Sequence, residues 1–279
     1  MSRFGLAGVM GWPVGHSRSP ALHGYWLKRY GIHGAYVPLA VPPDGLQQAL
    51  RALPILGFAG CNVTVPHKEA AFRTVDHTDA AARRTGSVNL VIVRPDGTLE
   101  GRSTDGYGFI ESLRQAAPHW VPGHGPVMLI GAGGAARAVA AALLDAGETR
   151  LRLVNRTDAR AAALAQDFGA AVEPWPWALR NIAATTCHLL INTTILGMAG
   201  QSPLPLDLAL LPHKSIVCDI VYVPLETPLL AAARARGNFT VDGLGMLLHQ
   251  ARPAFASWFG LDPAVDDGLR RAVMATFPP

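Results

Sequence analysis

Short apolar runs alternate with stretches of helical periodicity along the whole chain, and this alternation is typical of an α/β protein whose helices cover sheets. In the first half the expected strands are Phe4–Met10, Gly34–Val41 and Gly60–Val65, the expected helices are Ala21–Tyr30 and Leu46–Leu53, and the expected hairpin strands are Leu90–Arg94 and Thr98–Arg102. In the second half the expected strands are Val127–Ile130, Leu151–Val154, Leu189–Asn192, Ile216–Ile220 and Thr240–Val241, and the expected helices are Ala135–Leu144, Met246–Phe259 and Val265–Met274.

A connection rich in proline and glycine separates the two halves. Residues 116–126 hold three prolines and two glycines, and they lead directly into the strand that opens the second half. A length of 279 residues is also sufficient for two domains. The pattern therefore predicts a two-domain α/β protein.

The glycine-rich stretch after Ile130 predicts a nucleotide-binding turn. In its G-x-G-x-x-A pattern, Gly131 permits a tight turn, Gly133 lets the backbone approach a pyrophosphate, and Ala136 lets helix and strand pack closely. Unpaired backbone N–H groups at the start of the following helix, near Gly134, would point at the anion. The same string can occur in an ordinary turn, but the strand, helix and second strand around it form a βαβ unit of the expected length.

The end of the second strand predicts which dinucleotide is bound. An NAD site has Asp or Glu there to accept hydrogen bonds from the ribose hydroxyls. This chain has Asn155, Arg156 and Thr157 instead, with Arg160 one helical turn beyond. Guanidinium groups pair well with phosphate oxygens, so the 2′-phosphate of NADP is the predicted ligand. The alternative is a solvated helix start that Thr157 or Asn155 simply caps.

Composition and charge narrow the classes of partner. A hydrophobic content of 49% with 16% charged residues describes a globular protein with a sizeable core. The formal charge of +4 is modest, and the 24 basic residues form no block of five or more. Nucleic acid is therefore not expected as a partner, whereas anionic small molecules are.

Cysteine and histidine spacing predict neither disulfides nor a metal site. Cys61, Cys187 and Cys218 are isolated thiols without C-x-x-C spacing, which favours buried apolar side chains, and the ten histidines form no H-E-x-x-H motif. The apolar segment Ser2–Met10 is short and stops at a Gly-Trp-Pro sequence, so we expect a first strand rather than a signal peptide. No apolar run approaches membrane-spanning length, and we expect a cytoplasmic protein.

Polar residues of the first half gather in segments where a purely structural loop would not require them. They are Ser17, Ser19, Asn62, Thr64, Lys68, Asn89 and Asp105. Ser19 could simply cap a helix that starts with Pro20. Lys68, however, is poorly placed as a solubilising charge, and Asp105 is expected in a glycine-flanked turn. Taken together, the set suits a small polyhydroxylated ligand that carries a carboxylate.

Nine ordered motifs give the chain a resemblance to the shikimate/quinate dehydrogenase family over nearly its whole length. They are GHSRSP, NVTVPHK, GSVN, STDG, GAGGAARA, NRTDAR, INTTILGM, DIVYVPLETPLL and DGLGMLLHQA. Such a series is far more specific than a single glycine turn. The resemblance implies NADP-linked, reversible oxidation of shikimate to 3-dehydroshikimate, a step of chorismate and aromatic amino acid biosynthesis.

The resemblance also implies roles for individual residues. The catalytic pair would be Lys68 and Asp105, for which the alternative is a structural salt bridge. The substrate would be bound by Ser17 and Ser19 at its carboxylate, by Asn62, Thr64, Asn89 and Gln250 at its hydroxyls, and by Tyr222 as a neighbour. The cofactor would contact Gly131, Ala132, Gly133, Gly134 and Ala135 at the pyrophosphate, Asn155, Arg156, Thr157 and Arg160 at the adenosine phosphate, and Thr194, Met198, Val221, Gly243 and Met246 near the nicotinamide.

The family fold implies how the chain is divided. Residues 1–105 and 248–279 would form an α/β substrate domain, and residues 106–247 a Rossmann-type doubly wound NADP domain, with the active-site cleft between them. The C-terminal helices would return to the N-terminal part, which fits Gln250 as a substrate ligand. The protein would act as a monomer or a homodimer.

Four departures from the common family pattern keep other functions open. Leu90 stands where Thr is usual, Arg102-Ser103 where Asp-Asn is typical, Ile195-Leu196 where a more polar pair is usual, and His67 where Phe or Tyr is common. We expect these changes to surround the pocket, where they could mark a quinate or amino-shikimate dehydrogenase. A regulatory protein that binds NADP without turnover is a further alternative, although intact Lys68 and Asp105 argue against it.

Overall fold

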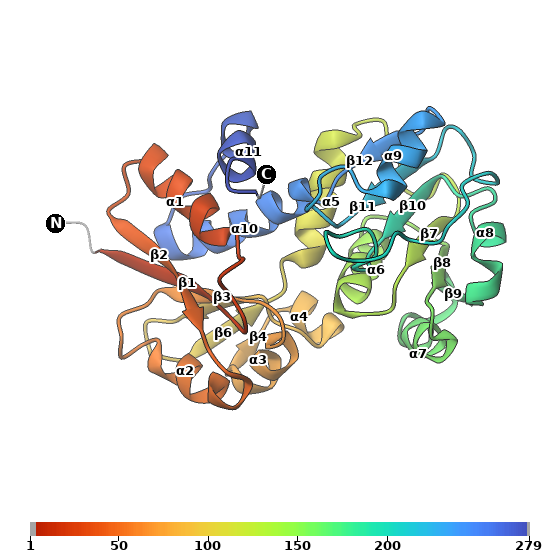
Figure 1. Ribbon diagram of the computed structural model, residues 1–279. Helices are drawn as coiled ribbons and strands as arrows, with labels where there is room; N and C mark the ends of the chain where they lie inside the picture. Colours follow the sequence, from red (N-terminus) through yellow and green to blue (C-terminus); the bar gives the residue numbers. More distant parts are fainter. Residues whose placement is uncertain (1–3, 278–279) are drawn as a thin grey trace. The chain divides into compact units, whose positions relative to one another are not determined.

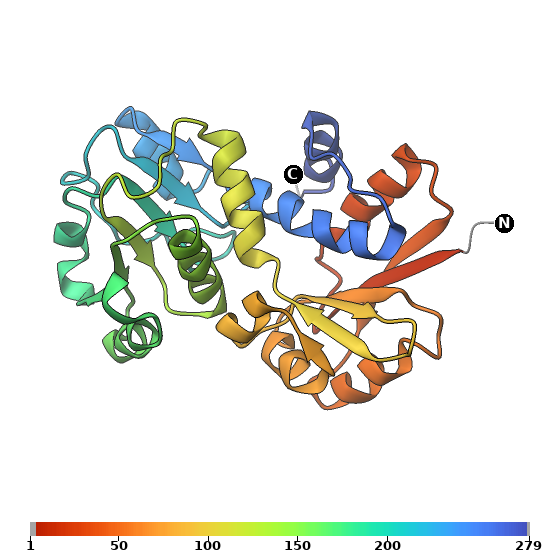
Figure 2. The ribbon, with the colours of Figure 1, turned by 180° about the vertical axis from the view of Figure 1, so that it is seen from behind.

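The computed structural model describes residues 4–277 and divides into two compact units. Unit 1 comprises Met1–Thr104 and Leu248–Pro279, and unit 2 comprises Asp105–Leu247. The chain therefore passes from one unit to the other after Thr104 and returns after Leu247, close to the divisions expected after residues 105 and 247. Figures 1 and 2 show each unit as a sheet with its own helices.

Unit 1 is built on a mixed six-stranded sheet with the strand order β2-β1-β3-β5-β6-β4. Its strands are β1 (Gly5–Gly11), β2 (Gly34–Ala40), β3 (Gly60–Val63), β4 (His77–Thr78), β5 (Leu90–Val93) and β6 (Leu99–Arg102). Strand β1 pairs in parallel with β2 and β3, whereas β5 pairs antiparallel with β3 and with β6. The carboxyl ends of β1 and β3 therefore lie at the same edge of the sheet, each followed by a loop that contains predicted site residues.

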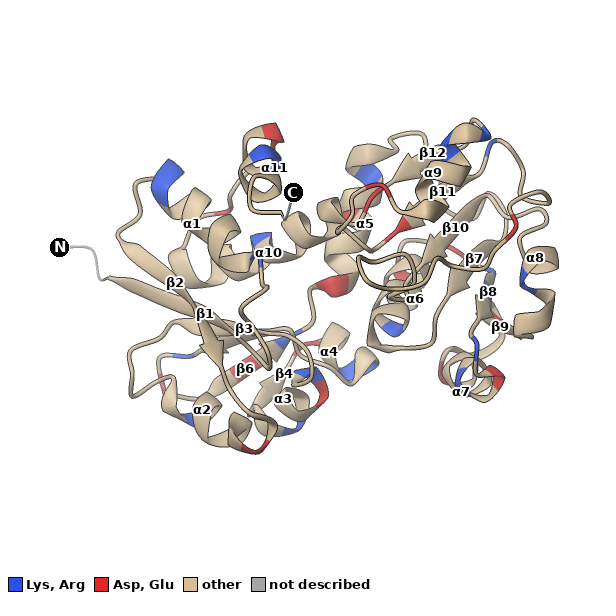
Figure 3. Cartoon of the chain, viewed as in Figure 1, with Lys and Arg blue, Asp and Glu red and all other residues tan. Residues whose placement is uncertain are grey.

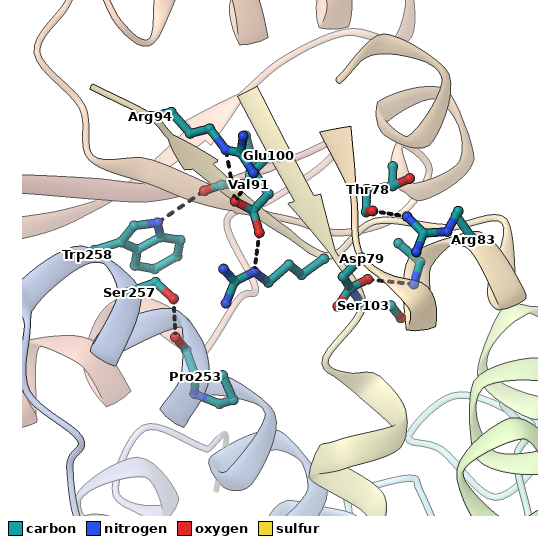
Figure 4. Close-up of polar contacts among 12 residues, drawn as sticks. Thr78, Asp79, Arg83, Val91, Arg94, Glu100, Ser103, Pro253, Ser257 and Trp258 are labelled. Atoms are coloured by element: carbon teal, nitrogen blue, oxygen red, sulfur yellow. Dashed lines mark hydrogen bonds and ion pairs between the residues drawn. The ribbon is translucent and has the colours of Figure 1, made fainter. Parts of the chain in front are cut away.

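The helices of unit 1 come from both ends of the chain. They are α1 (Ser19–Arg29), α2 (Leu46–Ala52), α3 (Lys68–Thr74), α4 (Ala80–Thr85) and α11 (Asp267–Met274), with η1 (Pro43–Gly45) as a 3-10 turn and α10 (Leu244–Phe259) entering from unit 2. A Cβ on Gly60 would lie 2.0 Å from the carbonyl oxygen of Val91 and 2.4 Å from the indole nitrogen of Trp258. Glycine there lets Trp258 donate to Val91 at 3.1 Å, which holds α10 on the sheet (Figure 4).

Unit 2 contains a fully parallel sheet with the strand order β12-β11-β10-β7-β8-β9. Its strands are β7 (Val127–Ile130), β8 (Leu151–Val154), β9 (Val172–Trp175), β10 (Leu189–Asn192), β11 (Ile216–Asp219) and β12 (Phe239–Val241). Its helices are α5 (Asp105–Ala116), α6 (Gly134–Asp145), α7 (Asp158–Phe168), α8 (Arg180–Ala183) and α9 (Pro228–Ala235), with 3-10 turns η2 (Gly169–Ala171) and η3 (Trp177–Leu179).

Alternate residues of β7 belong to different cores of unit 2, so helices cover both faces of its sheet. Val127 and Leu129 pack in the cluster that includes residues of α5, α6 and α7, whereas Met128 and Ile130 pack with residues of α8 and α9. The strand order reverses beside β7, which pairs with both β8 and β10. This reversal is the switch point at which doubly wound sheets bind ligands. The predicted α/β fold with a Rossmann-type unit is confirmed.

The sequence pattern missed helices α5, α7 and α9 and several shorter elements, and some of the shorter ones have a local reason. Strand β9 contains Pro174, which cannot donate to a ladder, but β9 is the edge strand of its sheet and tolerates it. Helices α3 and α4 have only seven and six residues, too few for helical periodicity to be visible. Helix α5 begins at Asp105, where we expected a turn. The segment after residue 116 is a connection without helix or strand, as predicted.

No helix within residues 4–277 is both long and apolar enough to span a membrane. Acidic and basic residues are interspersed along both units (Figure 3). All three cysteines are buried thiols.

Candidate active site

The glycine turn after β7 has the geometry that its sequence predicts. Gly131 has a φ of 116°, and a Cβ there would lie 2.6 Å from Thr193 Oγ1, so only glycine fits. Gly131 N donates to the Val154 carbonyl at 2.8 Å, which ties the turn to β8. In contrast, nothing lies within 4 Å of a Cβ built on Gly133 or Gly134. The backbone of these two residues is therefore open to a ligand.

Helix α6 begins at this turn without a side-chain cap. Gly133 occupies the N-cap position, and as a glycine it has no side chain that could cap the first turn. Ala132 and Ala135 are half-buried beside the turn, and Ala136 is completely buried in the core of unit 2. The first N–H groups of this 12-residue helix can thus bind an anion.

The residues after β8 are arranged as a charged, exposed segment. Arg156, Thr157 and Arg160 are exposed, and neither arginine makes an ion pair with any residue between 4 and 277. Thr157 occupies the N-cap position of α7 but makes no capping hydrogen bond within the described chain, and Asn155 Nδ2 donates to the Thr157 carbonyl at 2.9 Å. Capping by Thr157 or Asn155 is therefore wrong, although exposed arginines also fit the alternative of a solvated helix start.

The loops after β10 and β11 are joined by a buried carboxylate that the motif analysis did not single out. Asp219 is 2% exposed and accepts hydrogen bonds from Asn192 Nδ2 at 3.0 Å, Val221 N at 3.0 Å and Thr227 Oγ1 at 2.8 Å. Burial raises the pKa of Asp219 despite these donors. Asn192 Oδ1 in turn accepts from Thr194 N at 3.0 Å and Thr194 Oγ1 at 2.7 Å.

This hydrogen-bond network positions the segments that carry the expected nicotinamide neighbours. Val221 and Met246 are buried, Thr194 and Tyr222 are half-buried, and Met198 is exposed. A Cβ on Gly243 would lie 2.2 Å from the Ile220 carbonyl oxygen, so glycine is required for this close approach. In the sequence, only the DIVYVPLETPLL motif, which begins at Asp219, could have indicated its role. The spacing of charged residues gives no such signal.

In unit 1, the two serines before α1 form a local turn. Ser17 Oγ accepts from Ser19 N at 3.3 Å, and Ser17 N donates to the Val14 carbonyl at 3.0 Å. Arg18, not Ser19, occupies the N-cap position, and Ser19 is the first residue of α1. The interpretation of Ser19 as the helix cap is therefore wrong.

The predicted amide residues are bonded to each other and to two residues that sequence reasoning missed. Asn62 Oδ1 accepts from the Tyr36 hydroxyl at 2.7 Å, and Asn62 Nδ2 donates to the Asn89 carbonyl at 3.0 Å. Asn89 Oδ1 accepts from Thr104 N at 2.8 Å, and Thr104 Oγ1 donates to the Gln250 carbonyl at 2.9 Å. Thr64 directly follows β3 and, like Asn62, is half-buried while Val63 between them is buried.

Lys68 and Asp105 each stand at the first residue of a helix. Lys68 begins α3 in unit 1, and its carbonyl accepts from Val88 N at 3.0 Å, next to Asn89. Asp105 begins α5 and unit 2 and is 4% exposed. It directly follows Thr104, whose N–H is held by Asn89. The Lys68 backbone is therefore tied to the residue before Asn89, and Asp105 follows a residue that is bonded to the Asn89 side chain.

Comparison with known proteins identifies the family. Residues 9–91 match the shikimate dehydrogenase substrate binding domain, and residues 123–194 match the shikimate / quinate 5-dehydrogenase domain. The chain is 63% identical over 270 residues to the shikimate dehydrogenase (NADP(+)) of Paramagnetospirillum magneticum, covering 97% of this chain and 98% of that protein. The chain belongs to the shikimate dehydrogenase family.

Solved structures of two family members have the same fold. Shikimate 5-dehydrogenase from Thermus thermophilus, in complex with NADP(H) and shikimate, has a TM-score of 0.87 at 38% identity, over 98% of this chain and 99% of that chain. Quinate dehydrogenase from Corynebacterium glutamicum, in complex with NAD, has a TM-score of 0.89 at 32% identity, over 98% and 99% of the two chains.

Three of the four departures from the family pattern have structural partners in unit 1. His67 is 1% exposed, and its Nε2 lies 2.7 Å from the Val41 carbonyl. Leu90 is completely buried. Arg102 Nε pairs with Glu100 at 2.7 Å, beside the Arg94–Glu100 pair drawn in Figure 4. Packing and ion pairing account for these residues, so they give little support to an altered substrate. Ile195, by contrast, is 59% exposed.

Proposed function

We propose that this chain is an NADP-dependent oxidoreductase that interconverts shikimate and 3-dehydroshikimate by hydride transfer. The observation that carries the proposal is the 63% identity, over 97% of the chain, to a protein named shikimate dehydrogenase (NADP(+)). In this proposal unit 1 is the substrate domain and unit 2 is the NADP domain.

The contribution of the protein's own side chains to the reaction is the transfer of one proton. Oxidation of a secondary alcohol removes a hydride from carbon and a proton from oxygen, and NADP⁺ supplies the hydride acceptor. Lys68, as the neutral amine, would take the hydroxyl proton, and in the reverse direction its ammonium would give a proton to the carbonyl oxygen as the ketone is reduced. The Asp105 carboxylate would orient the Lys68 amine. A positioned base of this kind lowers the barrier because no free alkoxide forms.

Several features of unit 2 support NADP as the cofactor. The open backbone at Gly133 and Gly134 and the uncapped start of α6 fit a pyrophosphate. The exposed guanidinium groups of Arg156 and Arg160 fit a 2′-phosphate, and no carboxylate stands at the end of β8 to bind a free ribose hydroxyl. Gly131, Ala132, Ala135, Asn155 and Thr157 complete this side, while Thr194, Met198, Val221, Gly243 and Met246 would border the nicotinamide.

The hydrogen-bonded side chains of unit 1 support a polyhydroxylated acid as the substrate. Ser17 and Ser19 would bind the carboxylate, and Asn62, Thr64, Asn89 and Gln250 would bind the hydroxyls, with Tyr222 as a neighbour from unit 2. Asn62 and Asn89 are already fixed by partners, so little side-chain entropy is lost when the substrate binds.

The direct test is a steady-state assay of the purified protein with shikimate and quinate, each with NADP⁺ and NAD⁺, followed by absorbance of the reduced nicotinamide. We expect the highest kcat/KM for shikimate with NADP⁺. A higher value for quinate, or for an amino-shikimate assayed in the same way, would favour a quinate or amino-shikimate dehydrogenase instead. If NADP⁺ binds but no combination turns over, the chain is a non-catalytic NADP-binding protein.

The assembly and compartment are also proposals. A monomer or a homodimer is the expected form, which light scattering of the purified protein measures. Three buried thiols without a disulfide suit a reducing compartment, and we infer a cytoplasmic enzyme.

A further inference from the structure

Tyr36 is outside the set of residues assigned above, yet its hydroxyl bonds one of them. It lies on β2 and is 8% exposed. The phenol O–H donates to Asn62 Oδ1 at 2.7 Å. A buried oxygen therefore holds a side chain that is proposed to bind a substrate hydroxyl.

This contact completes the hydrogen bonding of the Asn62 amide. An asparagine side chain has a donor end and an acceptor end of almost equal shape, so it can turn over unless a partner distinguishes the two ends. The Asn89 carbonyl can only accept, so it takes Nδ2, at 3.0 Å, and leaves Oδ1 to accept from the Tyr36 O–H at 2.7 Å. Both ends of the amide are thus held before any ligand binds.

The Tyr36 ring packs between neighbouring aromatic rings. It stacks on His23 with ring centroids 4.1 Å apart and planes 9° apart, and it lies 6.0 Å from Trp258. Burial lowers the pKa of His23 to about 3, so that ring stays uncharged at neutral pH. Burial also raises the pKa of the Tyr36 phenol well above its ordinary value, so the hydroxyl keeps the proton that it donates.

We propose that Tyr36 is a positioning residue for substrate recognition, which holds the acceptor end of the Asn62 amide in place while Asn89 holds its donor end. The inference rests on the proposed function. Its consequence is that loss of the Tyr36 hydroxyl weakens substrate binding and leaves the cofactor unaffected, because Tyr36 contacts neither the reacting atoms nor unit 2 residues proposed for NADP.

The first experiment compares the wild-type enzyme with Tyr36→Phe, which removes one oxygen and keeps the ring stacked on His23. We expect the KM for shikimate to rise about tenfold, as for the loss of one buried hydrogen bond, while kcat and the KM for NADP⁺ change by less than about twofold. The matched control is Tyr30→Phe, whose hydroxyl accepts from Ala264 N at 3.0 Å elsewhere in unit 1. It should leave both KM values unchanged, and thermal melts of both variants check folding.

A second experiment separates positioning from general loosening of unit 1. Shikimate and its analogues lacking the 4- or the 5-hydroxyl are compared in wild type and Tyr36→Phe. If Tyr36 acts through Asn62, the analogue without the hydroxyl that Asn62 binds loses less than about twofold from the substitution, while shikimate loses about tenfold. A general defect would weaken all three ligands equally.

The outcomes also separate this inference from the proposed function. An active wild type whose shikimate KM is unchanged in Tyr36→Phe, or an equal loss for all three ligands, overturns the role of Tyr36 and leaves the dehydrogenase assignment standing. A wild type that oxidises none of the ligands overturns both.

Discussion

The two units prepare their proposed sites in different ways. In unit 1 the site side chains are bonded to each other, as when Asn89 Nδ2 donates to Thr104 Oγ1 at 3.0 Å. In unit 2 the proposed phosphate site consists of open backbone at Gly133 and of exposed arginines such as Arg156. The neutral hydroxyls of a polyhydroxylated acid are recognised only by donors and acceptors at fixed places, whereas a phosphate attracts positive charge over a longer range and tolerates mobile partners.

The largest effect is expected at Lys68, since it takes part in the chemistry. Lys68→Ala should lower kcat about 10³-fold because the proton of the substrate hydroxyl loses its acceptor. The dissociation constant of NADP⁺, measured by fluorescence titration, should stay within about twofold. Lys28→Ala removes an exposed lysine of α1 and serves as the control with unchanged kcat. A variant at Lys68 that keeps more than a tenth of wild-type kcat would remove it from the mechanism.

The next prediction asks whether unit 2 also depends on a side-chain network beneath its open turn. Asp219→Ala leaves three buried donors without their acceptor, from Asn192, Val221 and Thr227. We expect a loss of about 3 kcal/mol in the free energy of unfolding, measured with urea, and weaker NADP⁺ binding.

Asp219→Asn is the matched control, since its amide keeps one acceptor oxygen and the shape of the side chain. It should lose only about 1 kcal/mol. Equal losses in the two variants would mean that the hydrogen bonds to Asp219 do not hold the loops after β10 and β11.

The same contrast explains what the sequence could predict. The cofactor side follows from local pattern, because Gly131 and Gly133 are required by backbone geometry within a few residues of a strand. The bonds of Asn62 were not predictable, because its partners Tyr36 and Asn89 lie 26 and 27 residues away in the chain. Tyr36 itself reads as an ordinary strand residue, and only tertiary structure shows that its hydroxyl reaches the site.

Helix starts show the same limit. Ser19 before Pro20 has the sequence of a helix cap, yet the cap position is Arg18 and Ser19 is the first residue of α1. Asp105 has the sequence of a turn between glycines, but Gly106 lies where α5 approaches α6, with the Ala138 carbonyl oxygen 2.8 Å from a Cβ built on it. Close helix packing, not a turn, is what requires glycine there.

A smaller effect is expected at the exposed arginines of unit 2. Replacing Arg156 and Arg160 together by alanine should lower kcat/KM for NADP⁺ about 30-fold, since two charge-assisted contacts to the 2′-phosphate are lost. The value for NAD⁺, which lacks that phosphate, should change by less than about twofold. Arg150→Ala removes an equal charge just before the opposite end of β8 and controls for general electrostatics. Parallel losses for both cofactors would contradict the assignment.

A further effect is expected at His23, the buried ring of unit 1 on which Tyr36 stacks. His23 is completely buried, and neither ring nitrogen has a hydrogen-bond partner among the described residues. Burial lowers its pKa from 6.5 to about 3. Below pH 6.5 the unfolded chain therefore binds a proton that the folded chain does not, and folding stability is lost as the pH falls through this window, by about 1.4 kcal/mol per pH unit.

His23→Phe keeps an aromatic ring beneath Tyr36 and removes the titrating group. Urea unfolding of both proteins at pH 6.5, 5.5 and 4.5 should show a steeper loss in wild type, and their difference cancels the carboxylates that titrate in both. If the two curves are parallel, His23 titrates normally and cannot be the uncharged ring on which Tyr36 stacks. Because the substitution leaves the Tyr36 hydroxyl in place, the KM for shikimate at neutral pH should stay within about twofold. This result would separate the effect of the stacked ring from the effect of the Tyr36 hydrogen bond.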